Sequence, residues 1–146
     1  MKNFLIFLFL SLLYATISFA DFSPDGSKMV FSSNMSGRLH IYISDSNGQN
    51  TKRISREAGS YFNPVWSPRW NMIAFEKYVS GRNFIGVMEL DGANERMIVE
   101  GYLVENPVWT KDGERILYNK TDKSGKVDLF IIDITGNNET RIILSP

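Results

Sequence analysis

The chain has 146 residues, a formal net charge of zero and no cysteine. Balanced charge argues against an extended surface for nucleic acid or anionic membrane, so we expect no nucleic-acid partner. The lack of cysteine excludes disulfide bonds, thiolate metal sites and cysteine nucleophiles. The length corresponds to one domain, and 43% hydrophobic and 13% aromatic residues suffice for a packed core.

The first twenty residues differ in composition from the rest of the chain. Lys2 is their only charged residue, and an apolar run over Phe4–Leu13 follows it. With small residues just before Asp21, this pattern is typical of a secretory signal peptide cleaved at that point. The apolar run is shorter than the roughly 18–20 residues of a membrane-spanning helix. We therefore expect a helical signal peptide over 1–20, export, and a mature domain over 21–146.

From Phe22 onward the sequence repeats itself with an offset of 43 or 44 residues. Each repeat opens on an aromatic residue, Phe22, Trp66 or Trp109, and contains two apolar runs separated by a Ser-Gly pair. An acidic residue and a glycine turn follow the second run, and each repeat closes on an isoleucine, namely Ile54, Ile98 and Ile142. A regular period of this length is typical of repeat folds such as β-propellers.

Each repeat predicts four short β-strands. The apolar runs are rich in β-branched and aromatic side chains and are bounded by Gly, Asn, Asp and Ser. Apolar residues at consecutive positions, as in Ile85–Met88, indicate strands that are covered on both faces. A small antiparallel sheet packed between copies of itself is a propeller blade. We predict an all-β fold, a partial β-propeller of about three four-stranded blades over the units 22–62, 63–105 and 106–146.

Two details of the repeat predict local structure. The opening aromatics are expected on the innermost strands, where they fill the contact between blades. An Asn-Pro pair precedes Trp66 and Trp109, which suits a strand entry where proline costs no ladder hydrogen bond. Trp70 stands where the other repeats have Gly26 and Gly113, so we expect a turn of a different type there, without positive φ.

The sequence offers no constellation for catalysis or metal binding. His40 is the only histidine, and no GxSxG motif accompanies it, so serine hydrolase chemistry and histidine metal sites are not expected. The segment Asp45–Gly48 has the composition of a calcium loop but neither its length nor its closing glutamate, and a hairpin turn explains it. We expect no enzyme and no cofactor.

We expect binding on the loops that join the last strand of one blade to the first strand of the next. These loops are predicted over Arg56–Asn63 and Glu100–Asn106, and their mixture of charge and tyrosine suits a protein-binding surface. The alternative is that they are solvated loops with their tyrosines tucked under the blades. The candidate binding residues are Arg56, Glu57, Tyr61, Asn63, Glu100, Tyr102 and Glu105.

The openings Phe22–Gly26, Trp66–Trp70 and Trp109–Gly113 resemble the repeat of the TolB family, which also occurs in the non-catalytic propellers of prolyl-oligopeptidase-type enzymes. The resemblance covers Phe22 to Leu144. It implies a periplasmic, non-enzymatic scaffold of the Tol–Pal system, which serves envelope integrity and cell division. It also implies that the rim loops bind the peptidoglycan-associated lipoprotein Pal. TolA binding belongs to the amino-terminal domain of the family and is not expected, because no residues match that domain.

Three blades cannot close a ring, so each terminal sheet would leave an apolar face in water. Three outcomes remain open at this point. The first is a non-functional remnant of a truncated gene that has lost the amino-terminal domain and about half of the blades. The second is a homodimer that closes a six-bladed ring. In the third, another chain supplies the missing blades. The propeller portion of a prolyl-oligopeptidase-like hydrolase is a further alternative.

Overall fold

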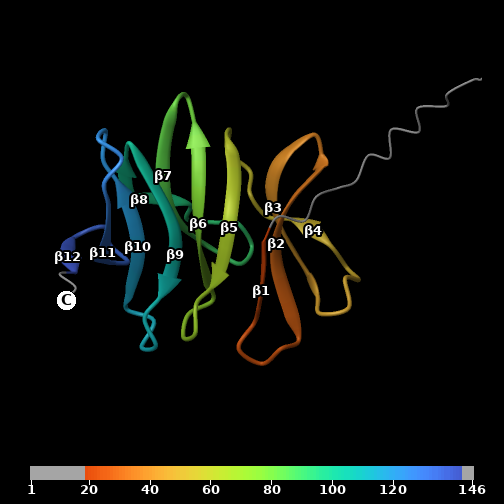
Figure 1. Ribbon diagram of the computed structural model, residues 1–146. Helices are drawn as coiled ribbons and strands as arrows, with labels where there is room; N and C mark the ends of the chain where they lie inside the picture. The colour runs from red at the N-terminus through yellow and green to blue at the C-terminus, as the bar shows by residue number, and fades with distance from the viewer. Residues whose placement is uncertain (1–18, 143–146) are drawn as a thin grey trace, which may run out of the picture.

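The computed structural model describes residues 19–142, which form three four-stranded antiparallel sheets and no helix. The sheets follow one another in chain order, with β1, β5 and β9 as their first strands (Figure 1). The predicted all-β partial propeller of three four-stranded blades is therefore confirmed. Residues 1–18 of the signal peptide predicted over 1–20 lie outside the described part, whereas Ala20, predicted as its last helical residue, is the first residue of β1. Between residues 19 and 142 no helix is long and apolar enough to cross a membrane.

Each blade is one continuous segment of chain, because the strand order in every sheet follows the sequence. Blade 1 contains β1 (Ala20–Phe22), β2 (Lys28–Ser36), β3 (Arg38–Asp45) and β4 (Lys52–Arg53). Blade 2 contains β5 (Ser60–Trp66), β6 (Met72–Val79), β7 (Arg82–Glu89) and β8 (Arg96–Gly101). Blade 3 contains β9 (Leu103–Trp109), β10 (Arg115–Thr121), β11 (Val127–Asp133) and β12 (Thr140–Ile142).

The Asn-Pro pairs form β-bulges inside β5 and β9. The pairing register shifts between Phe62 and Val65, and at the same point of β9. Asn63 and Asn106 have φ of 45° and 57°, a left-handed conformation that asparagine tolerates better than most residues. Proline at the bulge costs no ladder bond, as predicted. The strands nevertheless run through the bulge, so β5 and β9 begin at residues 60 and 103, three residues before the unit boundaries expected from the sequence.

The turn at Trp70 differs from its counterparts, as predicted. Gly26 and Gly113 have φ of 70° and 71°, whereas Trp70 is not among the described residues with positive φ. The indole Nε1–H of Trp70 donates a hydrogen bond to the carbonyl of Gly113 at 3.0 Å. The tryptophan therefore ties the turn of blade 2 to the turn of blade 3.

Two hydrophobic clusters hold the blades together. We call the face of a blade that is turned toward the preceding blade its leading face, and the opposite face its trailing face. Between blades 1 and 2 the buried residues are Val30, Ile41, Ile43, Ile54, Tyr61, Ile73, Phe75 and Met88. Between blades 2 and 3 they are Ala74, Ile85, Val87, Ile98, Val99, Val104, Trp109, Ile116, Tyr118 and Ile132.

The opening aromatics behave differently in the three blades. Trp109 is buried in the cluster between blades 2 and 3, and Trp66 packs against the cluster between blades 1 and 2, as predicted. Phe22 occupies the same position on β1 but is 52% exposed, so the prediction is wrong for this residue. The physical reason is that no described blade lies against the leading face of blade 1.

Candidate protein-binding rim

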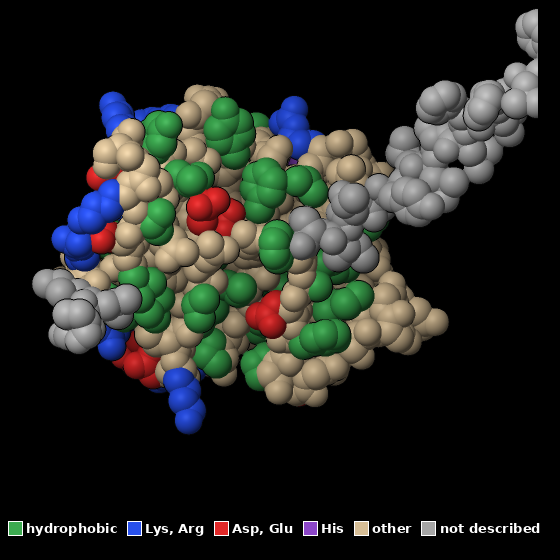
Figure 2. Space-filling model, in the orientation of Figure 1, with side chains coloured by type: hydrophobic (Ala, Val, Ile, Leu, Met, Phe, Trp, Pro, Cys, Tyr) green, Lys and Arg blue, Asp and Glu red, His purple; other side chains and the backbone are tan. Residues whose placement is uncertain are grey.

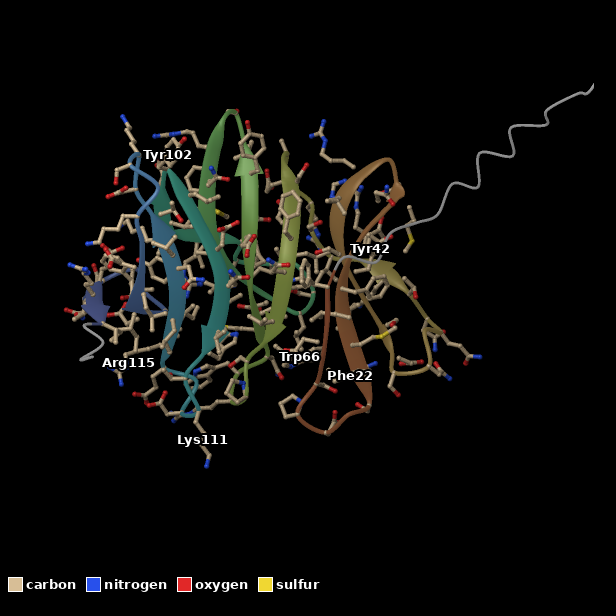
Figure 3. All side chains as sticks on the ribbon, in the orientation of Figure 1. Phe22, Tyr42, Trp66, Tyr102, Lys111 and Arg115 are labelled. Atoms are coloured by element: carbon tan, nitrogen blue, oxygen red, sulfur yellow. The ribbon has the colours of Figure 1, made fainter. Side chains whose placement is uncertain are left out.

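One end of the blades gathers the connections predicted to bind a partner. Because neighbouring strands are antiparallel, the hairpin between β6 and β7 lies at the same end as the link from β8 to β9. We call this end the upper rim, since it is at the top of Figure 1. Figure 3 shows Tyr102 at the upper rim, and Phe22, Trp66, Lys111 and Arg115 toward the opposite end.

Four of the seven predicted binding residues are exposed. Tyr102, between β8 and β9, is 64% exposed, and its backbone carbonyl accepts a hydrogen bond from Asn83 Nδ2 at 2.8 Å. Glu100 forms an exposed ion pair with Arg82 at 2.5 Å, across β7 and β8. The other two exposed residues are Arg56 and Glu57.

Arg56 is exposed and already makes one contact with the neighbouring blade. Its guanidinium donates a hydrogen bond to the carbonyl of Asp91 at 2.9 Å. Asp91 lies in the turn between β7 and β8, so Arg56 links blade 1 to that turn of blade 2. The described contact of Arg56 is one between blades, and its predicted role in binding stays a prediction.

Tyr61 is fully buried, which agrees with the alternative of a tyrosine tucked under the blades and not with a residue on an exposed binding loop. β5 begins at Ser60, so Tyr61 belongs to a strand and lies on the leading face of blade 2. Its hydroxyl donates to Glu95 at 2.9 Å, and the ammonium of Lys77 lies 2.5 Å from the same carboxylate. Burial, with the Glu95 charge adding to it, raises the pKa of Tyr61. Tyr61 therefore stabilises the blade and is not a rim contact.

Asn63 and Glu105 surround a half-buried carboxylate. Glu76 Oε1 accepts hydrogen bonds from Asn63 Nδ2 at 2.5 Å and from the backbone N–H of Asn106 at 2.6 Å. Burial raises the pKa of Glu76, and the nearby charge of Glu105 acts in the same direction. This arrangement fixes the bulges of β5 and β9 relative to each other. Asn63 thus positions the backbone of the site, while Glu105 is half-buried at its border.

A groove runs along the upper rim between blades 2 and 3. Its inner part is a hollow of about 260 Å³ that contains Glu76 and Glu105, and it adjoins a wider, more open depression. We call the whole depression the rim groove. It is lined by Tyr78, Arg82, Asn83, Glu100, Tyr102, Leu103, Glu105 and Lys123.

Four of the lining residues named above lie outside the two links in which binding residues were predicted. Tyr78, Arg82, Asn83 and Lys123 flank hairpin turns, whereas the prediction considered only the links between blades. The sequence contained the information needed to predict them. Neighbouring strands run in opposite directions, so the Ser-Gly hairpin that follows the second strand of a blade must lie at the end where the first strand begins. Tyr78 is 48% exposed, so the groove is bordered by two exposed tyrosines.

His40 lies in a small hydrogen-bonded network in blade 1. His40 Nδ1 lies 3.1 Å from the hydroxyl of Ser55, which also accepts the backbone N–H of Ile41. Burial lowers the pKa of His40, and the neighbouring arginines act in the same direction. Among residues 19–142 no three histidine or acidic side chains gather where they could hold a metal ion.

Figure 2 shows the side of the molecule on which β1, β5 and β9 lie. Hydrophobic side chains are spread over much of this side, acidic groups lie among them, and lysine and arginine side chains lie mostly toward the edges. Such a mixed surface, with a groove bordered by tyrosines, suits recognition of another protein.

These features define a protein of the β-propeller class, built from a contiguous arc of blades. The TolB beta propeller domain matches residues 15–145 of the chain. The chain belongs to this family.

The Tol-Pal system protein TolB of Wolbachia pipientis wMel is 39% identical over 105 residues, which are 72% of this chain and 25% of the relative. The chain thus spans about a quarter of the length of the curated relative. A structure of putative TolB from Agrobacterium tumefaciens superposes with a TM-score of 0.74 at 21% identity and covers 83% of this chain and 47% of that one. Acylaminoacyl peptidase from Pyrococcus horikoshii shares the fold, with a TM-score of 0.67, 17% identity and coverage of 88% and 25%.

Proposed function

We propose that the chain is an exported, non-catalytic scaffold of the Tol–Pal cell-envelope system that binds a protein partner through the rim groove. Membership of the TolB propeller family supports the system, and the name of the Wolbachia relative supports Pal as the first partner to test. The composition of residues 1–20 supports export to the periplasm.

The observation that carries the binding role is the pair of exposed tyrosines beside a hollow. Tyr78 and Tyr102 are 48% and 64% exposed, and both line the same depression. Tyrosine is enriched at protein interfaces because it combines a large apolar ring with a hydroxyl and loses little conformational entropy. Here the partner would cover both rings and the hollow between them.

Charges at the border of the groove would set the orientation of the partner. Arg82 and Glu100 are 60% and 45% exposed and pair with each other, and Lys123 lines the same depression. Exposed charges of this kind contribute more to association rate and specificity than to affinity. We expect their removal to slow association more than it speeds dissociation.

The test is a binding titration of the full chain with the soluble domain of Pal. Tyr102→Ala is expected to weaken binding at least tenfold, because a central tyrosine of an interface contributes on the order of 2 kcal/mol. Tyr78→Ala should weaken it to a similar degree. Tyr102→Phe retains the ring and should lose less than either alanine variant.

Lys111→Ala is the matched control, since Lys111 is exposed at the opposite end of the blades (Figure 3). Its affinity for Pal should equal that of the unsubstituted chain. Binding that is unaffected by both tyrosine substitutions would refute the rim groove as the site. No binding of Pal by the unsubstituted, folded chain would refute Pal as the partner.

A further inference from the structure

The two junctions inside the chain use the same positions of the repeat. At each junction four aliphatic residues of one blade's trailing face are buried beneath the next blade. Val30, Ile41, Ile43 and Ile54 do this in blade 1, and Ala74, Ile85, Val87 and Ile98 do it in blade 2. All eight are at most 9% exposed.

The trailing face of blade 3 carries the same set of residues without a described neighbour. Leu117, Leu129, Ile131 and Ile142 stand 43 or 44 residues after their counterparts in blade 2 and are only half-buried. Val108 on the adjacent strand is 57% exposed, whereas its counterpart Val65 packs against the cluster between blades 2 and 3. This face is therefore built as one half of a blade junction.

The leading face of blade 1 supplies the other half. In blades 2 and 3 a turn glycine approaches the preceding blade: a Cβ on Gly92 would lie 2.0 Å from the carbonyl oxygen of Ile54, and one on Gly136 would lie 3.3 Å from that of Ile98. The counterpart in blade 1, Gly48, has nothing within 4 Å. Gly48 is thus a glycine like its counterparts, although no described residue approaches it as closely as Ile54 and Ile98 approach theirs.

Two other positions repeat this contrast. Gly113 would place a Cβ 2.8 Å from Arg69, whereas its counterpart Gly26 has nothing within 4 Å. Trp109 is 9% exposed, whereas Phe22 is 52% exposed. Elsewhere on this face Phe31 and Tyr42 stack on each other and are buried, so the unfilled part of the junction is the part around Phe22, Gly26 and Gly48.

We infer that a second copy of this chain docks its blade 1 onto blade 3 of the first, with Phe22 against the strand of Val108 and Gly48 near the backbone of Ile142. A second copy is the fitting occupant because both halves of one junction lie at opposite ends of the same chain, and the chain itself contains that junction twice. Such a head-to-tail contact forms a closed ring when its rotation permits closure. Two copies would then bury both end faces of each.

The inference goes beyond the proposed function and does not depend on it. The experiment is sedimentation velocity and light scattering of the full chain over a range of concentrations. The expected particle has twice the mass of the single chain. A folded single chain at every concentration would overturn the inference. These faces would then be left for a longer polypeptide or another partner to cover.

Complementary variants make the test specific. Phe22→Arg blocks the leading face and Val108→Arg blocks the trailing face, and both residues are more than half exposed, so the fold should tolerate the change. Each variant alone should weaken self-association at least tenfold. Mixed in equal amounts they should form two-copy particles again, because one pair of intact faces remains. Lys111→Glu, at an exposed position in the turn between β9 and β10, should associate like the unsubstituted chain. Mixing without recovery would refute the proposed pairing of faces.

Discussion

The junction between blades 1 and 2 and the junction between blades 2 and 3 each contain a lysine–glutamate ion pair. The two pairs differ in how far they are exposed to solvent. On the leading face of blade 2, Lys77 and Glu95 are paired at 2.5 Å with exposures of 7% and 8%. On the leading face of blade 3 the equivalent pair, Lys120 and Glu139, lies at 2.9 Å with exposures of 31% and 36%. The same two residue types thus make a buried ion pair in one blade and a partly solvated one in the next.

A tyrosine hydroxyl joins both ion pairs, but it comes from different strands. In blade 2 Tyr61 of β5 donates to Glu95, and in blade 3 Tyr118 of β10 donates to Glu139. The position of Tyr61 is occupied by Val104 in blade 3. The tyrosine hydroxyl therefore reaches the glutamate in both blades, although a different strand supplies the tyrosine. The energy of the ion pair depends on the packing around it.

The largest expected effect comes from breaking the buried pair. Glu95→Gln leaves the Lys77 charge uncompensated in the core and should lower the free energy of unfolding by about 3–5 kcal/mol. Glu139→Gln should cost about 1 kcal/mol or less, because solvent screens the remaining charge. Urea unfolding of both variants measures the difference. Equal costs would contradict the role of burial.

A second substitution probes how tightly the junction between blades 2 and 3 is packed. Ala74 is fully buried, whereas the same position is Leu117 in blade 3 and half-buried. Ala74→Leu should destabilise the chain by about 1–3 kcal/mol, because the added methyl groups have no space. Leu117→Ala is the matched control and should change the stability of the single chain by less. Thermal unfolding at low protein concentration distinguishes the two.

The tryptophans allow the two junctions to be compared at one position. Trp109 is buried, and its Nε1–H donates to the carbonyl of Val65 at 3.1 Å. Trp109→Phe removes this hydrogen bond and part of the ring and should cost about 1–2 kcal/mol. Trp66→Phe should cost less, since Trp66 is only half-buried. A larger loss for Trp66→Phe in urea unfolding would reverse the order proposed here.

The smallest expected effect concerns the carboxylate of Glu76, whose counterpart in the other junction is Ser32. The pKa of Glu76 is raised above the ordinary value of 4.5, so the folded chain holds this proton more tightly than the unfolded chain does. Its contribution to stability is therefore greatest below pH 4.5 and is lost as the pH rises through the raised pKa. Glu76→Gln keeps an acceptor for Asn106 and removes the titration, so stability should depend less on pH in that interval.

Urea unfolding between pH 4 and pH 7 measures this dependence. At neutral pH the Glu76→Gln variant should be as stable as the unsubstituted chain or slightly more stable. Glu105→Gln should weaken the pH dependence to a smaller extent, because it removes only the neighbouring charge that helps to raise the pKa of Glu76. A variant with an unchanged slope would show that the Glu76 proton does not differ between the folded and unfolded states.

The repeat made the sheets predictable, because the strand positions follow from apolar runs and turn residues that recur in register. It also located Trp66 and Trp109 in the contacts between blades. The sequence offered the burial of Tyr61 only as an alternative and did not show which face of the blade it lies on, since simple alternation from Trp66 places it on the opposite face. The bulge at Asn63 reverses that alternation, and the length of strand beyond a bulge is not encoded in a local pattern.

The rim could be predicted only in part for a similar reason. Tyr102 was found because it lies in a link between blades, where charge and aromatic residues stand out in the sequence. Tyr78 and Arg82 come from a hairpin that meets this link only in three dimensions. The pairing of Lys77 with Glu95, 18 residues apart, likewise depends on the packing of blade 2 and has no counterpart in blade 1, where Ser33 and Thr51 occupy the two positions.

The strand order within each sheet has a consequence at the level of the gene. Every sheet takes its four strands from consecutive segments of the chain, so the codons for each blade follow one another in sequence order. Recombination between equivalent codons, such as those of Trp66 and Trp109, would remove or add a complete sheet and leave all hydrogen-bond ladders intact. The number of blades can therefore change in a single genetic event, and the products would differ in how many exposed faces they must bury and not in whether their sheets can form.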